Sequence, residues 1–341
     1  MTLAAWLQLE WYAQRRPSPA LWLLLPLHIL FVLISACRRL AYRCGILPTI
    51  RLPVPVIVVG NLVAGGVGKT PLVLWLVKEL QRRGRRPGIV SRGYGGTAKS
   101  IRPVPSDSPV AEVGDEPLML ARRSGVPVWI GADRAAAGQA LLATHAEVDI
   151  LIADDGLQHY RLARDAEVVV FDGRGAGNGW RLPIGPLREP LCRLRQVTAL
   201  VFNDGASERV QAAAPAVPQF DMNLLPGSFC RLGDPSCSCS VEAMKCKKLH
   251  ALAGIGAPSR FFGTLKSLGL QFAEHPFPDH HVFTASDLDF GSESVLLMTE
   301  KDAVKCTGLT SCEAWVLPVI AQLPPQLADF LVEKIDGRQI A

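Results

Sequence analysis

The sequence predicts an α/β protein with a doubly wound parallel sheet, a second and smaller α/β lobe, and one apolar helix at the N-terminus. Short β-branched runs alternate with helical patterns and stop at polar residues, which is typical of parallel sheets that bind ligands at the carboxyl ends of their strands. The same alternation restarts near Leu249, and residues 20–37 contain no charged side chain. We therefore expect an N-terminal anchor over residues 1–45, a first lobe over 46–225 and a second lobe over 226–341.

The N-terminal apolar segment reads ALWLLLPLHILFVLISAC from Ala20 to Cys37, with arginines on both sides. About 20 apolar residues are needed to cross a bilayer, so the segment is of borderline length. A cleaved signal peptide is disfavoured because arginines follow the run. A buried core helix stays open, but Trp6, Trp11 and Tyr12 upstream favour a helix that inserts into a membrane or lies at its surface.

The net charge of +5 comes from the N-terminal region, because residues 1–51 contain six arginines and a single acid. A nucleic-acid-binding protein would spread its positive charge over the folded body. Here the excess flanks the apolar segment, so we expect contact with anionic membrane lipids and no nucleic-acid partner. No segment points to an obligatory protein partner.

The 9 cysteines are odd in number and lack the spacing of a small secreted protein, which indicates reduced thiols in the cytoplasm. Four of them fall between residues 230 and 246, with spacings that match none of the common zinc patterns. A cysteine-rich surface loop is favoured there, and a metal site remains the alternative.

A glycine-rich loop joins a predicted strand to a predicted helix. The apolar run Leu52–Gly60 leads into NLVAGGVGKT at Asn61–Thr70, and the helical pattern Pro71–Arg83 follows and can end at Gly84. Strand, glycine-rich loop and helix in this order are the context of a phosphate-binding P-loop. In the usual G-x-x-x-x-G-K-[ST] pattern, the first glycine is replaced here by Val63.

The residue types explain how this loop would bind ATP. Gly65, Gly66 and Gly68 allow backbone N–H groups to surround the phosphates, and the helix N-terminus adds its positive dipole. Lys69 would reach the β- and γ-phosphates, and the Thr70 hydroxyl would bind Mg²⁺. The predicted ATP-binding residues are Val63, Ala64, Gly65, Gly66, Val67, Gly68, Lys69 and Thr70.

Further strands of the first lobe are expected, and each of them stops at polar residues. They cover Pro87–Ser91, Pro127–Ile130, Asp149–Ala153, Glu167–Phe171 and Thr198–Phe202. Asp154 and Asp155 end the third of these runs, in the sequence LIADDGLQH. The pattern resembles a Walker B strand, whose acid holds Mg²⁺, and adjacent carboxylates are stabilised by a bound cation. A solvated Asp-Asp-Gly turn is the alternative.

Two more segments carry charge that could serve catalysis. Asp115 lies in Gly114–Pro117, before a short apolar helix, where it can cap the helix or accept a proton from an attacking hydroxyl. Arg188 and Glu189 lie in the proline-rich loop Arg181–Pro190. An arginine there can stabilise a transferring phosphoryl group. A surface loop with an ion pair is the alternative.

The second lobe is predicted from a new series of apolar runs. Strands are expected at Leu249–Gly256 and Ser294–Met298, a helix at Pro258–Gly269, and a late strand at Ala314–Ile320. Pro318 indicates that the late strand lies at a sheet edge. Two lobes around a cleft suit a kinase, which must exclude water from ATP.

Together these segments resemble the tetraacyldisaccharide 4′-kinase family, the lipid A 4′-kinases. The resemblance runs in order from the apolar segment to beyond residue 305, although the family usually has Ser or Thr in place of Val63. Its stretches are VGNLVAGGVGKTP (59–71), SRGYGG (91–96), GDEP (114–117), ADDGLQH (153–159), GNGWRLPIGPLREP (177–190), AGIGAPSRFF (253–262), FPDHH (277–281) and MTEKDAVK (298–305).

The resemblance implies a kinase that transfers the γ-phosphate of ATP to the 4′-hydroxyl of a tetraacyldisaccharide 1-phosphate, giving lipid IVA for lipopolysaccharide biosynthesis. It implies Mg²⁺ as cofactor and a location at the cytoplasmic face of the inner membrane. The implied base is Asp115, supported by His280, and the implied catalytic set is completed by Lys69, Arg188 and Glu189. Mg²⁺ is expected at Thr70, Asp154 and Asp155, and the substrate at Tyr94, Arg134, Gln158 and His159.

A membrane-recruited nucleotide switch or a metallochaperone-type NTPase is the alternative, since such proteins also use GG-x-GKT loops. It predicts a guanine-reading Asn/Thr-Lys-x-Asp segment, which Thr299–Asp302 superficially resembles. A soluble small-molecule kinase is disfavoured by the apolar N-terminal segment.

Overall fold

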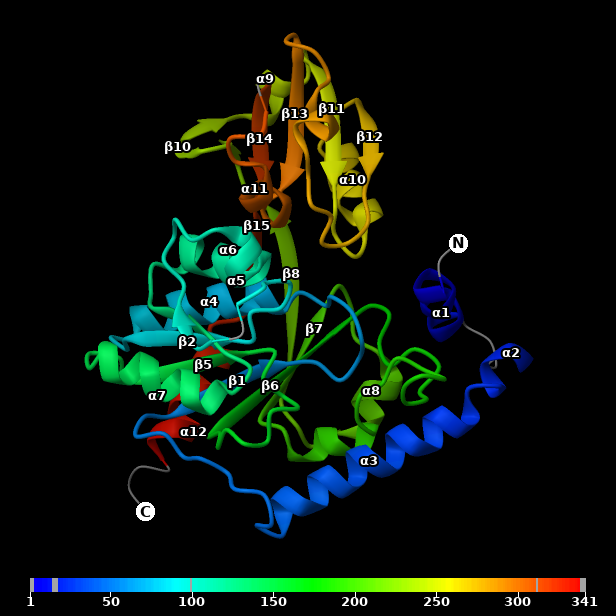
Figure 1. Ribbon diagram of the computed structural model, residues 1–341, viewed down its shortest axis with the longest axis vertical. Helices are drawn as coiled ribbons and strands as arrows, with labels where there is room; N and C mark the ends of the chain where they lie inside the picture. The colour runs from blue at the N-terminus through cyan, green and yellow to red at the C-terminus, as the bar shows by residue number, and fades with distance from the viewer. Residues whose placement is uncertain (1–2, 14–17, 99, 311, 338–341) are drawn as a thin grey trace.

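The computed structural model describes residues 3–13, 18–98, 100–310 and 312–337, and it forms two lobes built on separate sheets (Figure 1). The larger lobe holds a 9-stranded sheet and the smaller lobe a 6-stranded sheet. The smaller lobe lies at one end of the larger one, with β8 running between them (Figure 1). The predicted α/β class with a second, smaller lobe is therefore confirmed.

The larger sheet is parallel from β8 to β4 and antiparallel only at its two edge strands, β15 and β3. The strand that precedes the glycine-rich loop, β1, lies in the middle, as the predicted doubly wound sheet requires. In spatial order the strands are β15 (Val319–Gln322), β8 (Gln219–Pro226), β7 (Ala199–Asn203), β6 (Ala166–Asp172), β1 (Val56–Gly60), β5 (Ile150–Asp154), β2 (Pro87–Ser91), β4 (Val128–Ile130) and β3 (Arg102–Pro103).

The first long helix of this lobe, α4 (Lys69–Arg82), follows the glycine-rich loop directly and packs against β1, β2, β5 and β15. Leu72, Leu76 and Leu80 recur at helical spacing and are fully buried, so they fix this face on the sheet. Gly84, at φ 76°, supplies the left-handed residue that ends the helix. The other helices of the lobe are α5 (Val110–Val113), α6 (Asp115–Ser124), α7 (Arg134–Thr144), η1 (Leu191–Gln196), α8 (Glu208–Ala213) and α12 (Gln326–Asp336).

Strand register brings the polar strand ends to one edge of the larger sheet. Val59 of β1 lies beside Asp154 of β5, and Asp172 of β6 lies beside Asn203 of β7. Both β1 and β5 are buried along their whole length, as parallel strands covered on two faces should be. Because parallel strands end at the same edge, this edge positions the candidate site.

The smaller lobe has a parallel core extended by an antiparallel hairpin. Its strands, in spatial order, are β10 (Asp234–Cys239), β9 (Phe229–Arg231), β14 (Glu313–Leu317), β13 (Ser294–Thr299), β11 (Lys248–Ala253) and β12 (Phe272–Pro276). Its helices are α9 (Val241–Met244), α10 (Pro258–Ser267), η2 (Ala285–Leu288) and α11 (Glu300–Cys306).

The cysteine-rich segment contributes the hairpin of β9 and β10 rather than the surface loop that we expected. Cys237 and Cys239 are partly buried and pack against the core of the smaller lobe, which explains why the chain pairs here. Within the described ranges, no group of three or more His, Cys, Asp or Glu side chains could hold a metal ion.

The predicted late strand Ala314–Ile320 is two strands that belong to different sheets. Pro318 separates β14 from β15, because a proline has no N–H to continue the ladder. The chain then returns to the larger lobe, where β15 pairs with β8 and α12 packs against α4. Leu327 and Leu331 complete the larger core. The second lobe was predicted to extend over residues 226–341, and its predicted C-terminal bound is therefore wrong.

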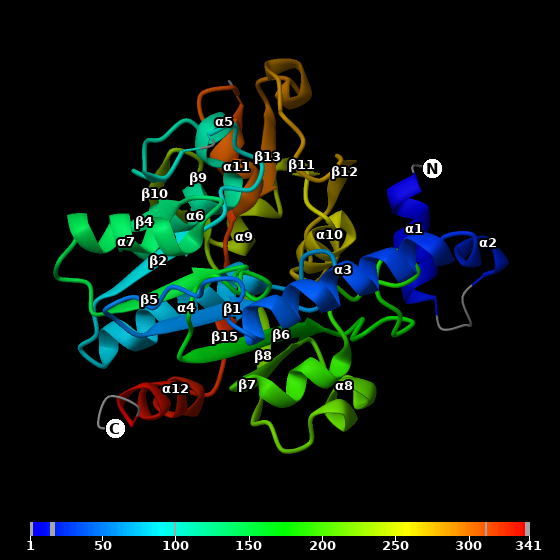
Figure 2. The same ribbon diagram turned by 60° about the horizontal axis from the view of Figure 1, so that its bottom comes forward.

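The N-terminal helices lie along the outside of the larger lobe (Figure 2). They are α1 (Leu3–Tyr12), α2 (Pro19–Trp22) and α3 (Leu25–Arg43). The apolar segment is thus not one continuous helix, because Pro26 belongs to the first turn of α3 and cannot extend α2. By length and composition α3 could cross a membrane, and only 6% of its apolar window is buried. The alternative of a buried core helix is therefore wrong.

Polar contacts hold α3 against the body of the protein. The Nδ1 atom of the buried His28 lies 3.0 Å from the carbonyl oxygen of Arg181. Farther along the helix, the ring of Tyr42 packs on that of Tyr160, with centroids 5.9 Å apart. Trp11 of α1 donates to the carbonyl oxygen of Pro183 at 2.9 Å. The irregular loop of residues 181–190 therefore joins the N-terminal helices to the larger lobe.

Candidate active site

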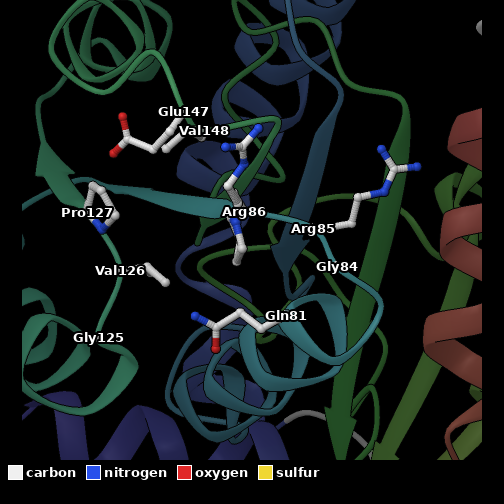
Figure 3. A pocket seen from close by; sticks show the side chains of 10 residues that line it. Gln81, Gly84, Arg85, Arg86, Gly125, Val126, Pro127, Glu147 and Val148 are labelled. Carbon is white, nitrogen blue, oxygen red and sulfur yellow. The ribbon is translucent and has the colours of Figure 1, made fainter.

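A cleft of about 1480 Å³ opens between the two lobes at the carboxyl edge of the larger sheet. Its walls come from the glycine-rich loop and α6 of the larger lobe, from α10 and α11 of the smaller lobe, and from α3. A second hollow of about 400 Å³ lies at the amino end of β2 (Figure 3). There Arg85 pairs with Asp336 and points away from Arg86 (Figure 3). The charged groups of the smaller hollow diverge, so the cleft is the candidate site.

Two asparagines shape the glycine-rich loop by binding its carbonyl oxygens. The Asn61 amide donates to the carbonyl oxygens of Val63 at 2.8 Å and Gly65 at 3.0 Å. The Asn203 amide, at the end of β7, donates to the carbonyl oxygen of Val67 at 3.1 Å. Carbonyl oxygens repel phosphate, so holding them with donors is what an anion-binding backbone loop requires.

The predicted ATP-binding residues divide into two groups. Gly65, Gly66, Gly68, Lys69 and Thr70 line the cleft. The side chains of Val63 and Val67 instead point into the core, where neither is exposed to solvent, and Ala64 donates its N–H to the carbonyl oxygen of Pro186 at 2.8 Å. Val63, Ala64 and Val67 therefore fix the loop to its surroundings, a role that a motif alone cannot distinguish from ligand contact.

Two of the glycines are required by geometry. Gly65 has φ 108° and Gly68 has φ 95°, conformations that side chains disfavour. A Cβ atom at Gly68 would also lie 2.8 Å from the Asn203 amide nitrogen. At Gly66 a Cβ atom would meet nothing within 4 Å, so the expected need for glycine holds at two of the three positions.

Lys69 and the adjacent acids form one electrostatic cluster. The Nζ atom of Lys69 lies 3.5 Å from Asp155 Oδ1 and 3.4 Å from Asn61 Oδ1. Burial raises the pKa of Asp154 to about 7. Burial also acts to raise the pKa of Asp155, but Lys69 and Arg188 outweigh it and hold that pKa below its usual range. The two neighbouring carboxyls are therefore chemically distinct.

The acids fit a bound magnesium ion. Among the residues that the structure describes, Asp154 Oδ1 and Asp155 Oδ1 are buried and have no hydrogen-bond partner. Hard cations prefer oxygen ligands of this kind, and the Thr70 hydroxyl is in the same cleft. A cation there would favour the ionised form of Asp154, which burial alone disfavours.

Arg188 and Glu189 point in different directions. Arg188 lies 3.5 Å from Asp155 Oδ1 and 3.4 Å from Gln158 Oε1, so it faces the acids. Glu189 is 3% exposed, accepts from the Tyr160 hydroxyl at 2.5 Å and lies 3.6 Å from Arg193. The expected surface ion pair between the two is not formed, and both residues line the cleft.

Arg134 and His159, expected as substrate contacts, lie behind Asp155. Arg134 is 8% exposed and donates to the carbonyl oxygen of Asp155 at 3.2 Å, while its backbone N–H donates to His159 Nε2 at 3.2 Å. Burial, helped by Arg134, lowers the pKa of His159 to about 4, so this imidazole is neutral. In the described ranges neither belongs to the wall of the cleft, whereas Tyr94 and Gln158 do.

The structure brings Asp115 and His280 together from different lobes. His280 Nδ1 lies 2.9 Å from Asp115 Oδ2, although 165 positions separate the two residues. Asp115 is 4% exposed and begins α6, and the ring of Tyr94 packs edge-on against His280 with centroids 5.2 Å apart. Of the two, His280 lines the cleft, while Asp115, in the described ranges, is not part of its wall and meets it through this contact. A carboxylate and an imidazole in contact in this way can accept a proton from a bound hydroxyl.

Strained backbone also marks this cleft. Within the described ranges, the non-glycine residues with positive φ are Asp155 at 48°, Asp204 at 65° and His280 at 59°. All three line the cleft. Such conformations cost free energy and persist mainly where function requires them.

Sequence reasoning missed several charged residues of the cleft. Lys301 of α11 contacts Glu116 of α6 at 3.2 Å. On the opposite wall, Arg260 of α10 donates to Asp172 of β6 at 3.0 Å. Asp172 was visible as a polar strand end. Lys301 was noticed only within a family-like stretch and the segment that resembles a guanine-reading motif, and Arg260 only within a family-like stretch, so neither had a predicted role in this cleft.

Comparison with known proteins agrees with this architecture. The profile of the family described as tetraacyldisaccharide-1-P 4′-kinase matches residues 20–336. A tetraacyldisaccharide 4′-kinase from Dechloromonas aromatica (strain RCB) is 58% identical over 340 residues, covering 99% of this chain and 100% of the relative. Another from Azoarcus sp. (strain BH72) is 48% identical over 322 residues, covering 94% of each chain.

Among solved structures, the chain is similar to LpxK from Aquifex aeolicus, crystallised in an "apo" form in complex with ATP. The two share 30% sequence identity with a TM-score of 0.79, over 93% of this chain and 99% of the other. Fold, sequence and family profile agree along nearly the whole chain. This chain therefore belongs to the tetraacyldisaccharide-1-P 4′-kinase family.

Proposed function

We propose that this protein phosphorylates the 4′-hydroxyl of a tetraacyldisaccharide 1-phosphate with ATP, in lipid A biosynthesis, and that the cleft between its lobes is where this occurs. The observation that carries the proposal is the cleft itself, whose wall includes the P-loop, the adjacent acids Asp154 and Asp155, and His280 in contact with Asp115. In the reaction the 4′-oxygen forms a bond to the γ-phosphorus, the bond from that phosphorus to the β-phosphate bridge breaks, and ADP leaves.

The phosphate side of the cleft binds and stabilises the nucleotide. Backbone N–H groups around Gly65 and Gly68, with the N-terminus of α4, would surround the phosphates. Lys69 and Arg188 both face Asp155 and supply positive charge where the phosphoryl group is transferred. Thr70, Asp154 and Asp155 would hold Mg²⁺, which when bound neutralises charge on the β- and γ-phosphates.

The opposite side of the cleft accepts the proton. As the 4′-hydroxyl attacks, its proton passes to the pair of Asp115 and His280, with the Asp115 carboxylate as the base and the imidazole as its partner. Because the pair spans both lobes, it is complete only when the lobes are together. Assembling the base in this way ties proton transfer to closure around the substrate.

The third wall suits a lipid. Phe31, Ile34 and Arg38 of α3 line the cleft, while Leu30 and Leu33 of the same helix are exposed. This places an apolar surface and a cation beside the reaction centre, as an acylated sugar phosphate would require. We assign the protein to the cytoplasmic face of the inner membrane, with α3 at the membrane interface, since this helix lies along the body (Figure 2).

A guanine-reading nucleotide switch is not favoured by the geometry. In the segment that resembles such a motif, the Asp302 carboxylate is fully buried and accepts from the N–H of Gly254 at 3.0 Å and from the Thr299 hydroxyl at 2.7 Å. A carboxylate held in this way cannot also read a base edge.

The test is direct. Purified protein is incubated with ATP, Mg²⁺ and a tetraacyldisaccharide 1-phosphate, and the masses of the lipid products are measured by mass spectrometry. We expect one added phosphate on the lipid and stoichiometric ADP, both absent with the Lys69→Ala variant. Hydrolysis of ATP without a phosphorylated lipid, or a strict requirement for GTP, would contradict the proposal.

A further inference from the structure

The segment Thr299–Asp302 begins α11 and is rigidly anchored in the smaller lobe. The buried Asp302 carboxylate accepts from Gly254 and Thr299, and Lys305 pairs with it at 2.8 Å. Glu300 accepts from the N–H of Val319 at 3.0 Å and also pairs with Arg123 of α6. These contacts fix the first turn of α11 against the larger lobe, so the position of Lys301 within that turn is also fixed.

Lys301 ends in a cluster that joins both lobes. Its Nζ atom lies 3.2 Å from Glu116 Oε1 in the larger lobe and 3.2 Å from Asp279 Oδ1 in the smaller one. It also lies 3.4 Å from His280 Nε2 and 3.9 Å from Asp115 Oδ2. Burial acts to lower the pKa of Lys301, but the surrounding carboxylates outweigh it and hold that pKa above its usual range, so the ammonium stays charged.

We propose that Lys301 is a positioning residue for proton transfer, which selects the tautomer of His280 and holds the imidazole against Asp115. The inference rests on the proposed function, because it assigns Lys301 a role toward the proposed base. It also gives a task to the segment Thr299–Asp302, which the phosphate-transfer chemistry does not use.

The argument follows from donor and acceptor chemistry. An ammonium can only donate, so its contact with His280 Nε2 requires a lone pair on that nitrogen. The proton of the neutral imidazole then sits on Nδ1, from which it is donated to Asp115 Oδ2 at 2.9 Å. With both ring nitrogens engaged, the Asp115 carboxylate remains as the group that accepts the substrate proton.

Charge acts in the same direction as geometry. Lys301 places a positive charge beside the pair, which opposes the addition of a proton there. The charged and titratable groups that face His280 from the elements around it are Asp115 and Glu116 of α6, Asp279 of its own loop, Lys301 of α11, and Tyr94 of the loop after β2.

The experiment measures kcat and the KM for ATP against pH for Lys301→Gln, Lys301→Arg and the full-length wild type. We expect Lys301→Gln to lower kcat about 10- to 100-fold near neutral pH, the range for a misplaced catalytic group. The acidic limb of the profile of kcat against pH should move to higher pH by about one unit in this variant, because the positive charge of Lys301 is lost. The KM for ATP should stay at its wild-type value. Lys301→Arg keeps the charge, so the acidic limb of its pH profile should coincide with that of the wild type.

Lys305→Gln is the matched control, since it removes a lysine from the same helix that contacts Asp302 and not the pair. It should lower the unfolding temperature and leave the acidic limb in place. The inference is overturned if the acidic limb of the pH profile of Lys301→Gln coincides with that of the wild type, or if Lys305→Gln shows the same shift as Lys301→Gln. If Asp115→Ala and His280→Ala are inactive in the same assay, that outcome leaves the proposed function standing. Should both alanine variants keep wild-type kcat, the pair is not the base and the inference falls, while the kinase activity stands or falls with the phosphorylated lipid.

A second measurement needs no substitution of Lys301. In wild-type protein labelled with ¹⁵N-histidine, the His280 resonances, assigned by their loss in His280→Ala, should report a protonated Nδ1 and an unprotonated Nε2. A proton on Nε2 would overturn the inference, because Lys301 could not then donate to that atom.

Discussion

The two sides of the cleft are built in different ways. The phosphate side comes from one continuous segment, Asn61–Thr70, whose carbonyl oxygens are held by donors of the same lobe. The proton side comes from three separate segments: the start of α6 in the larger lobe, and Asp279–His280 with the first turn of α11 in the smaller lobe. One side is complete within a lobe, and the other exists only where two lobes meet.

This difference separates nucleotide binding from proton transfer. The P-loop can bind phosphates whatever the position of the smaller lobe, because its supports do not leave the larger lobe. The acid–imidazole pair depends on lobe position, because its two members move apart if the lobes do. Substitutions on the two sides should therefore have different kinetic signatures.

A large effect on kcat is expected on the phosphate side. Lys69→Ala should lower kcat by at least about 10²-fold, because it removes charge stabilisation from the transferring phosphoryl group. The exposed Lys78→Ala on the same helix is the matched control and should behave as wild type. A Lys69→Ala variant that keeps more than about a tenth of wild-type kcat cannot be reconciled with a P-loop role.

The metal acids come next. Asp154→Asn and Asp155→Asn should each move the Mg²⁺ titration of activity to about 10-fold or higher concentrations, since neutral amides are weaker ligands for a hard cation. Asp107→Asn, at an exposed position, controls for loss of a carboxylate elsewhere. Unchanged Mg²⁺ titrations in both variants would rule out these residues as the metal site.

Substitutions on the exposed face of α3 should change membrane attachment and leave nucleotide binding and proton transfer unchanged. Replacing Leu27, Leu30 and Leu33 of α3 by serine removes exposed apolar surface, so the variant should partition largely into the soluble fraction after lysis. Its KM for ATP should stay within about twofold of wild type. Recovery of the variant in salt-washed membranes would show that another surface carries the attachment.

A small effect is expected at the contact between Arg260 and Asp172, on the opposite wall of the cleft. Arg260→Ala removes a guanidinium that is 45% exposed and pairs with Asp172, which keeps Arg174 as a partner. Exposed ion pairs contribute little, so we expect a change of about two- to fivefold in the KM for ATP. Lys266→Ala on the same helix is the control. A loss of kcat comparable with that of Lys69→Ala would assign Arg260 to catalysis.

Much of the fold was predictable because its signals are local. Buried parallel strands are short apolar runs, and every predicted strand of the larger lobe appears within a few residues of its expected bounds. Prolines account for two of the errors in strand bounds. Pro53 and Pro55 lie in the predicted first strand, which therefore starts only at Val56. Pro318 divides the apolar run Ala314–Ile320, which was predicted as one strand, into β14 and β15. Which sheet receives β15 depends on contacts far along the chain, which hydropathy does not encode.

The site divides in the same way. The sequence identified the phosphate loop and the paired acids, since their chemistry depends on neighbours in the chain. It could not show that Arg134 and His159 support Asp155 from behind, because a motif does not reveal which side of a loop faces a ligand. Lys301 could not be assigned without knowing that α11 meets α6.

The central claim is that Asp115 and His280 act as one proton-accepting unit across the cleft, and a kinetic double-mutant cycle tests it most directly. Asp115→Ala and His280→Ala should each lower kcat by about 10²- to 10⁴-fold, the range for loss of a general base, with little change in ATP affinity. The double variant should be barely worse than either single one, since residues that act as a unit are strongly non-additive. Strictly multiplicative losses, or a main effect on ATP binding, would show that the two residues serve separate purposes and that the base lies elsewhere.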